Sequence, residues 1–316
     1  ERGLERFRLR ANMLFAAHVN PWSQPFSAGR PMLERAFSEA NELGDITFAS
    51  YCCSNLVTLL LVTGEELGAA QDQAEFRLQF VRDHQFGFVA DLITPSLQLI
   101  RCLRGKLPIF GRLDGDDFAE EEFAKRLEHH PIAQCWYWVR KLQARFLAGD
   151  YAAAADAASK AETLLWTSVY MVEFAEYHFY AALARAACFD HVGETERSTL
   201  RRLLAEHAGQ LRRWAENAPA NFEDRATLVE AEIARIEGRT LEAMDLYERA
   251  IRSATEHGFL HQRAIANELA GRFHAGRGFE TIGRAYLREA RDCYHRWGAA
   301  GKVSQLDRLA PPSRLD

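Results

Sequence analysis

The fold of this chain is indicated most clearly by the stretch Gly238-Arg-Thr-Leu-Glu-Ala-Met-Asp-Leu-Tyr-Glu-Arg-Ala250. A glycine opens it, and apolar side chains then recur at intervals of three residues, at Leu241, Met244 and Tyr247. This spacing places them on one face of an α-helix, with charged residues around the rest. Strict alternation of apolar and polar residues, which would indicate a β-strand, is almost absent from the chain. The stretch therefore predicts a helix that begins just after Gly238.

The same pattern returns along the chain, which makes it a repeat protein. Anchor glycines stand 44, 45 and 40 residues apart, at Gly149, Gly193, Gly238 and Gly278. Five residues after each anchor stands a small residue: Ala154, Ser198, Ala243 and Gly283. Twelve residues after each anchor stands an alanine: Ala161, Ala205, Ala250 and Ala290. Glycine ends a helix cheaply in the left-handed conformation, and small residues two turns apart let the next helix pack closely.

We therefore predict an all-α fold, a right-handed superhelix (α-solenoid) of about seven helical hairpins of the tetratricopeptide (TPR) type. The repeat period exceeds the ~34 residues of a standard TPR unit, so the helices should be longer. First helices are expected near Leu4–Val19, Ile46–Thr63, Phe88–Arg104, Ile132–Ala148, Tyr170–His191, Phe222–Glu237 and Gln262–Ala275. Residues 1–310 should form a single elongated domain, and residues 311–316 a linker.

The composition narrows the functional classes. The 316 residues are 48% hydrophobic and 26% charged, which is enough apolar material for one long core. A net charge of −5 argues against nucleic-acid binding, which usually goes with a basic excess. No apolar run reaches the ~18 residues of a membrane span. Six cysteines lie mostly in apolar helical context without metal-ligand spacing, which is typical of buried thiols in a reducing compartment. We therefore expect a cytoplasmic protein.

The sequence contains no motif of nucleotide binding or covalent catalysis. The patterns of P-loops, dinucleotide-binding loops, nucleophile elbows, zinc proteases and kinases are all missing. The cluster Glu128-His129-His130 precedes Pro131 and is interpreted as a helix end, where histidines interact favourably with the dipole, rather than as a metal site. We expect no cofactor, no metal and no enzymatic activity in this segment.

A row of side chains on the first helices is the candidate binding surface. In TPR-like hairpins the first helix lines the concave face, so the positions thirteen and six residues before each anchor glycine should point into the groove. Among them are the candidates Tyr51, Trp136, Gln143, Tyr180, Arg225, Glu232 and Arg272. Aromatic and arginine side chains commonly anchor a peptide or a partner helix. The alternative, which we favour for the aromatics, is that they belong to the hairpin core, because aromatic side chains on helices mostly serve packing.

The chain also resembles a known family over nearly its whole length. At the N-terminal end the resemblance is carried by His18-Val-Asn-Pro-Trp-Ser-Gln-Pro-Phe26, Pro31-Met-Leu-Glu-Arg-Ala-Phe37 and Leu43-Gly-Asp-Ile-Thr-Phe-Ala-Ser-Tyr51. At the C-terminal end it is carried by Tyr286-Leu-Arg-Glu-Ala-Arg-Asp-Cys-Tyr-His-Arg-Trp-Gly-Ala-Ala-Gly-Lys-Val-Ser-Gln-Leu306. These stretches are similar to the TPR-like region of bacterial multi-domain signalling kinases. Their usual order is a Ser/Thr-kinase-like domain, an AAA/STAND ATPase, this region, a GAF sensor and often a sensor histidine kinase. A related STAND regulator is an alternative parent.

The resemblance implies a non-catalytic segment, because the kinase and ATPase motifs of such proteins are not in these residues. The chain begins at Glu1 without a methionine, and we interpret it as a piece of a longer protein. We expect it to relay state between an ATPase switch and an output domain. Its partner would be a protein or peptide, a neighbouring domain or a small-molecule effector, and neither nucleic acid nor membrane. Two alternatives stay open: a structural or dimerisation spacer, and a free-standing helical enzyme.

Overall fold

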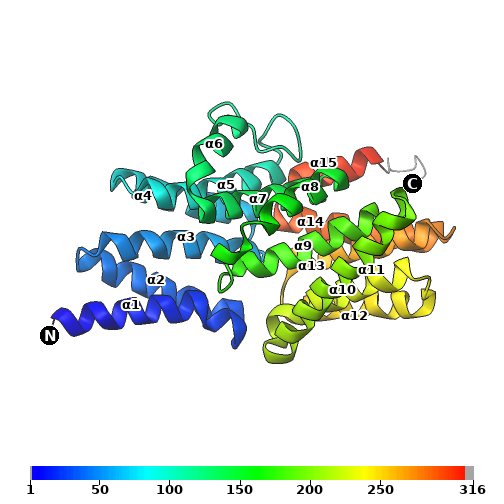
Figure 1. Ribbon diagram of the computed structural model, residues 1–316, viewed down its shortest axis with the longest axis horizontal. Helices are drawn as coiled ribbons and strands as arrows, with labels where there is room; N and C mark the ends of the chain where they lie inside the picture. The colour runs from blue at the N-terminus through cyan, green and yellow to red at the C-terminus, as the bar shows by residue number, and fades with distance from the viewer. Residues whose placement is uncertain (1, 310–316) are drawn as a thin grey trace.

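The computed structural model describes residues 2–309 of the chain, and the regular structure in that range is helical (Figure 1). The helices are α1 (Arg2–His18), α2 (Phe26–Glu42), α3 (Ile46–Val62), α4 (Leu67–Asp83), α5 (Gly87–Leu103), α6 (Glu120–Arg126), α7 (Pro131–Leu147), α8 (Tyr151–Glu162), α9 (Val172–Cys188), α10 (Glu194–Asn217), α11 (Pro219–Ile236), α12 (Thr240–Glu256), α13 (Leu260–Ala275), α14 (Glu280–Trp297) and α15 (Ala300–Leu309). The predicted all-α fold is confirmed. The expected linker at residues 311–316 lies outside the described range.

Seven helical hairpins follow one another, as the sequence predicts. Their first helices are α1, α3, α5, α7, α9, α11 and α13, and each begins and ends within three residues of its expected bounds. Two of them, α7 and α11, begin on a proline (Pro131 and Pro219), where the first turn needs no backbone donor. The third hairpin is irregular, because its second helix, α6, has seven residues and follows a long loop over residues 104–119.

The anchor glycines turn the chain in three of the four repeats. Gly149, Gly238 and Gly278 have φ angles of +76°, +75° and +84°, the left-handed conformation expected after a helix. Gly193 does not follow the prediction, since its φ is −74° and it lies at the start of α10. The cause is an extra 3₁₀ turn, Phe189–His191, which follows α9 and shifts the chain before the next helix begins.

The packing of the second helices divides in the same way. The small residues expected at the helix contacts are buried in α8, α12 and α14: Ala154, Ala161, Ala243, Ala250, Gly283 and Ala290. In α10 the corresponding Ser198 and Ala205 are exposed, because the shifted start rotates the helix. One expectation for the stretch from Gly238 to Ala250 is wrong. Leu241 is 82% exposed, and the buried face of α12 is formed by Ala243, Leu246, Tyr247 and Ala250 instead.

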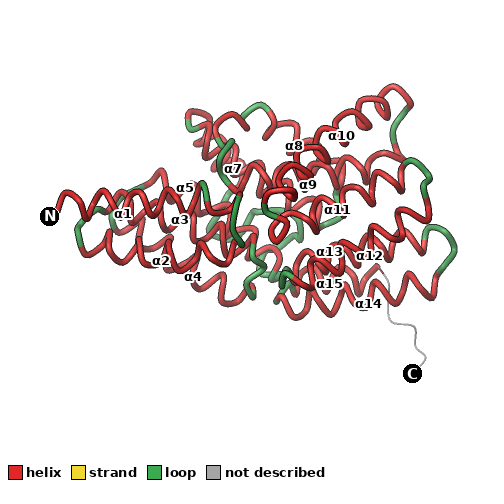
Figure 2. The backbone as a smooth tube through the Cα atoms, turned by 90° about the horizontal axis from the view of Figure 1, so that it is seen from below, coloured by secondary structure: helices red, strands yellow, loops and turns green. Residues whose placement is uncertain are grey.

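The array is elongated, with α1 and α2 at one end and α11 to α14 towards the other (Figures 1 and 2). Its last helices lie back against the middle of the chain. The indole Nε1 of Trp297 donates a hydrogen bond to the carbonyl of Glu65 at 3.0 Å. In α15 the ammonium of Lys302 donates to the carbonyl of Leu147, at the end of α7, at 2.7 Å. The C-terminal helices therefore contact the second and fourth hairpins.

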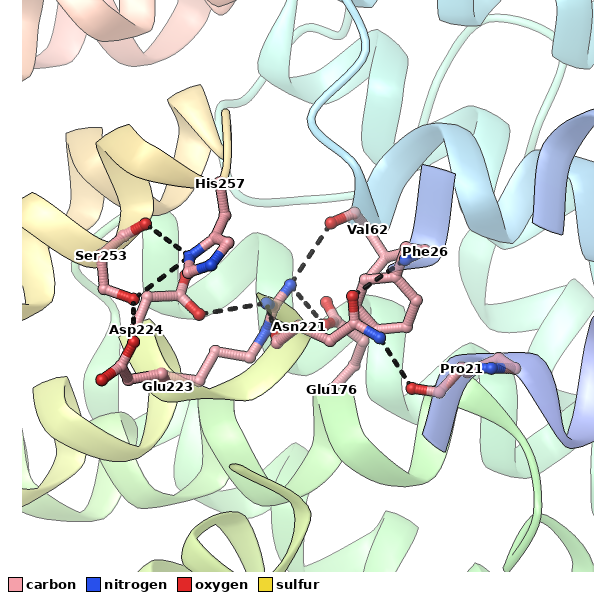
Figure 3. A network of polar contacts seen from close by, with 10 residues as sticks. Pro21, Phe26, Val62, Glu176, Asn221, Glu223, Asp224, Ser253 and His257 are labelled. Atoms are coloured by element: carbon pink, nitrogen blue, oxygen red, sulfur yellow. Dashed lines mark hydrogen bonds and ion pairs between the residues drawn. The ribbon is translucent and has the colours of Figure 1, made fainter. Parts of the chain in front are cut away.

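The N-terminal hairpin contacts the sixth hairpin through Asn221, which lies in the first turn of α11 (Figure 3). The side-chain oxygen of Asn221 accepts from the backbone N–H of Phe26 at 2.8 Å. Its amide nitrogen donates to the carbonyls of Pro21 at 2.8 Å and Gln24 at 2.7 Å. Asn221 is fully buried, so these bonds satisfy its side-chain amide in place of water. They attach the chain around residue 20 to the sixth hairpin.

Candidate functional site

The concave side opens at a cavity of about 550 Å³ between the start of α8 and the C-terminal ends of α9, α11 and α13. We call it the arginine cavity. Its walls combine three guanidinium groups with two carboxylates and an apolar surface, contributed by Arg235, Arg272, Arg277, Asp190, Glu232, Tyr151, Leu269 and Phe273. The C-terminal ends of helices carry partial negative charge, which favours arginines in their last turns.

Arg235 forms one wall and ties two helix ends together. Its guanidinium donates to the carbonyl of Ala186 in α9 at 2.8 Å, and to the carboxylates of Asp190 and Glu232, each at 2.9 Å. Burial alone would lower the pKa of Arg235, but the neighbouring carboxylate of Glu232 more than compensates, so the pKa is raised and the side chain stays charged. Because these groups already occupy its donors, Arg235 shapes the cavity.

Arg272 lies across the cavity in the last turn of α13, half-buried. Its guanidinium donates to Glu268 at 2.6 Å and to the hydroxyl of Tyr151. Glu268 also accepts from Lys302 at 2.8 Å. Burial would raise the pKa of Glu268, but Lys302 and then Arg272 hold it below its ordinary value. The carboxylate of Glu268 therefore stays ionised and fixes Arg272 at the cavity wall.

Arg277 is the most accessible of the three cations. It is exposed just after the end of α13, and its guanidinium carbon lies 4.8 Å from the centre of the Phe273 ring. Such a cation–π contact orients the guanidinium without neutralising its charge. The described lining residues include no serine, threonine, cysteine or lysine that could serve as a nucleophile. The arrangement is suited to recognition of an acidic group that has an apolar neighbour.

The structure divides the seven predicted groove residues into two groups. Glu232 and Arg272 line the arginine cavity. Tyr51 is half-buried, with its ring against Phe48 and Phe86. The remaining four lie inside the array, each at most 3% exposed: Trp136, Gln143, Tyr180 and Arg225. The expected continuous groove is therefore not open at those four positions, because their side chains are buried inside the array. Partner binding by Glu232 and Arg272 stays a prediction.

The interior of the array contains several buried ion pairs, and we call two of them the central cluster. Arg140 and Glu173 form the first at 2.8 Å, with side chains only 1% and 2% exposed. Arg225 and Glu176 form the second at 3.6 Å, with exposures of 0% and 3%. Burial raises the pKa of Glu173 above its ordinary value, against the attraction of Arg140. Such pairs are sensitive to the loss of either partner.

Further hydrogen bonds anchor the central cluster to neighbouring hairpins. Arg140 donates to the hydroxyl of Ser96 in α5 at 2.9 Å, and Glu173 accepts from Thr58 in α3. Arg225 donates to the carbonyl of Val62 at 3.3 Å (Figure 3). Sequence reasoning selected Arg225 as a binding residue and missed Arg140 and Glu173. The signal that could have found them is a charge on a first helix at a position that the helical pattern assigns to the interior.

Neither metal ligation nor membrane insertion finds support in the described residues. Between residues 2 and 309, no three His, Cys, Asp or Glu side chains come together as metal ligands would. His129 ends a 3₁₀ turn just before Pro131, in line with the helix-end interpretation. Over the same range, no helix combines the length and apolarity needed to cross a membrane.

Comparison with known proteins identifies the repeats. A family model described as "CHK1-like, TPR repeats" matches residues 106–272, which is more than half of the chain. The matched segment runs from the loop before α6 to the last turn of α13, and so includes both the central cluster and most of the arginine cavity. No curated protein matches the chain. From the matched repeats and the hairpins that they form, we conclude that this chain belongs to the family of CHK1-like TPR repeats.

Proposed function

We propose that this chain is a non-catalytic scaffold that binds a protein or peptide partner in the arginine cavity. TPR repeats stack into extended surfaces that suit protein–protein interaction, and membership of this family supports that general role. The observation that carries the proposal is the accessible guanidinium of Arg277 above Phe273, next to the fixed guanidinium of Arg272. Two adjacent cations beside an aromatic ring favour a ligand with an acidic group followed by an apolar side chain.

The proposal gives the two predicted groove residues in the cavity different roles. Arg272 would donate to the acidic group, because it is held in place by Glu268 and keeps an edge towards the cavity. Glu232 is 4% exposed and engaged by Arg235 and Tyr247, so it would orient the wall. Asp190 at the rim would disfavour a second acidic group, which gives the site selectivity by repulsion.

We further propose that the array acts as one elongated unit, residues 1–310, within a bacterial signalling protein. In that setting it would relay state between an ATPase switch and an output domain in the cytoplasm. The similarity of residues 18–51 and 286–306 to signalling kinases supports this context, and so do the thiols, which are unpaired in the described structure. The contacts of Asn221 and Trp297 between distant hairpins would transmit a change at one end to the other.

The test is a selection of peptides from a random phage-displayed library on the 316-residue chain, followed by affinity measurement. Enriched peptides should contain Asp or Glu next to an apolar residue. Arg272→Ala and Arg277→Ala should each weaken their binding about tenfold, the usual cost of one exposed charge-assisted contact. Arg202→Ala is the matched control, since Arg202 is an exposed arginine on α10, paired with Glu206, outside the cavity lining.

Two results would count against the proposal. Peptides that bind the Arg272→Ala and Arg277→Ala variants as tightly as the natural chain would place the binding surface elsewhere. A selection that enriches no peptide under any ionic strength would favour the structural spacer over the binding scaffold.

A further inference from the structure

A buried lysine, Lys302 in α15, lies behind the wall of the arginine cavity. It is only 1% exposed, although lysine is rarely buried this far without a partner. Together with Tyr151 and Leu269 it lines a small cavity of about 10 Å³, and those two residues also line the arginine cavity. An apolar side chain of similar volume would fill the same space without the cost of burying a charge. The charge of Lys302 therefore deserves an explanation.

The hydrogen bonds of Lys302 match the protonated ammonium. Its nitrogen donates to the carbonyl of Leu147 at 2.7 Å, to Glu268 at 2.8 Å and to the side-chain oxygen of Gln305 at 2.8 Å. An ammonium has one N–H for each of these acceptors, whereas a neutral amine has fewer. Burial lowers the pKa of Lys302, and the carboxylate of Glu268 opposes this. The last turn of α7, which contains Leu147, also carries partial negative charge that favours a cation.

Close backbone contacts hold α15 in place on both sides of Lys302. A Cβ atom on Gly301 would lie 2.8 Å from the carbonyl oxygen of Cys102 and 2.9 Å from the backbone nitrogen of Gly105, which is too close for any other residue. The helix thus rests directly on the end of α5. On the other side, Gln305 donates to the carbonyl of Ala148. The ammonium of Lys302 is therefore delivered to one fixed position.

The carboxylate of Glu268 is shared between two cations. One oxygen, Oε1, accepts from Lys302 at 2.8 Å and from Arg272 at 2.6 Å, while Oε2 accepts from the hydroxyl of Tyr294 at 2.8 Å. The side chain of Glu268 is 7% exposed and that of Arg272 is 36% exposed. Charges this close interact more strongly in the interior than in water. Lys302, Glu268 and Arg272 together have one positive charge in excess, whereas Glu268 and Arg272 alone would be neutral.

We propose that Lys302 is a positioning residue of the arginine cavity, which acts on an acidic ligand through Glu268 and Arg272. With α15 in place, the two cations share one carboxylate, so Arg272 keeps part of its charge for the ligand. Without Lys302, Glu268 would neutralise Arg272 alone. The inference rests on the function proposed above, and it adds that the packing of α15 sets the affinity of the cavity for an acidic group.

The first test compares a selected peptide that contains one acidic residue with its counterpart in which that residue is the corresponding amide. Lys302→Met in the 316-residue chain should weaken binding of the acidic peptide about tenfold and change binding of the amide peptide by less than about twofold. A loss of α15 packing alone would weaken both peptides alike. Lys125→Met is the matched control, since Lys125 is exposed on α6, paired with Glu121, outside the cavity lining.

A second substitution separates charge from packing. Glu268→Gln, added to Lys302→Met, removes the negative charge and keeps a side-chain oxygen to which Arg272 can donate. One positive charge is then again in excess, so the affinity for the acidic peptide should return to within about threefold of the natural chain. A double variant that binds the acidic peptide more weakly than Lys302→Met would overturn the proposal, because α15 would then act through packing.

Urea unfolding tests the shared carboxylate without any ligand. Lys302→Met leaves Glu268 with Arg272 in the natural chain, but with neither cation in an Arg272→Met background. The urea midpoint should therefore fall further when Lys302→Met is added to Arg272→Met than when it is made in the natural chain. Equal shifts would overturn the proposal, because the two cations would then act independently.

The outcomes distinguish this inference from the function on which it rests. If Arg272→Ala and Arg277→Ala weaken binding of the acidic peptide and Lys302→Met does not, the proposed function stands and this inference fails. If no acidic peptide binds the natural chain, or if binding ignores both arginines, the proposed function fails and this inference fails with it.

Discussion

The central cluster and the arginine cavity contain the same types of charged side chain, but the cluster is buried and the cavity is open. Both combine arginines and carboxylates that lie in, or just after, the helices α7, α9, α11 and α13. Around Arg140 and Arg225, the N-terminal hairpins cover the charges and bury them almost completely. Around Arg272 and Arg277, no helix between residues 2 and 309 closes the space. The difference indicates that coverage by distant hairpins decides which arginines stabilise the fold and which can meet a partner.

The largest effect should come from breaking the central cluster. Arg140→Ala would leave the carboxylate of Glu173 buried without its cation, which costs about 3–5 kcal/mol. The free energy of unfolding in urea measures this loss. In the matched double variant, Arg140→Met with Glu173→Met, the uncompensated charge is gone, and part of the stability should return. If Arg140→Ala unfolds at the same urea concentration as the natural chain, the cluster does not stabilise the fold.

A second effect should come from a histidine pair between α9 and α10, in which His207 is buried and His178 is half-buried. The Nδ1 atoms of His178 and His207 lie 2.9 Å apart. Burial, with a contribution from Arg185, lowers the pKa of His178 to about 4; burial and His178 lower that of His207 to about 2. Below an unfolded pKa of about 6.5, the unfolded chain binds protons that the folded chain excludes, so stability falls as the pH drops.

For His178 alone, the loss between pH 7 and pH 5 should be about 2 kcal/mol. Unfolding curves measured across that range give the slope. His178→Gln with His207→Gln should flatten the slope, whereas His191→Gln, which changes an exposed histidine of the cavity, should leave it as it was. If His191→Gln alters the slope and the double variant does not, the His178–His207 pair does not cause the pH dependence of stability.

The smallest effect on stability should come from the arginine cavity, where Arg277 is exposed. Arg277→Ala removes an exposed guanidinium that lies over the ring of Phe273, so the unfolding free energy should change by less than about 0.5 kcal/mol. Peptide binding should fall about tenfold in the same variant. A large loss of stability in Arg277→Ala would mean that this arginine supports the fold, as Arg140 does.

Much of the fold could be predicted from the sequence because hairpins are local. Gly149 and Gly238 turn the chain by their own conformation, and Ala154 and Ala243 make contacts within a few residues of those turns. The prediction for Gly193 was wrong because a 3₁₀ turn, Phe189–His191, is added before it. The residues of that turn show no sequence pattern comparable to an anchor glycine. The prediction that helix pairs stack at intervals of some forty residues is confirmed.

The candidate site was less predictable because the burial of a first-helix side chain depends on hairpins that are distant in the sequence. Arg225 and Arg272 are both expected to point into the groove from their first helices, yet one is fully buried and the other lines a cavity. What separates them is the placement of hairpins far away in the sequence, such as the bond from Phe26 to Asn221, which spans 195 residues. No periodicity within α11 or α13 contains that information.

The central claim is that partners meet the array at the arginine cavity and not at the covered stripe around Trp136. Hydrogen–deuterium exchange of the chain with and without a selected acidic peptide measures this most directly. The account predicts slower exchange at the ends of α9, α11 and α13, in peptides that contain residues 187–191, 232–236 and 269–277. Slower exchange centred on α3 and α7, around Tyr51 and Trp136, with no change at residues 269–277, would contradict it.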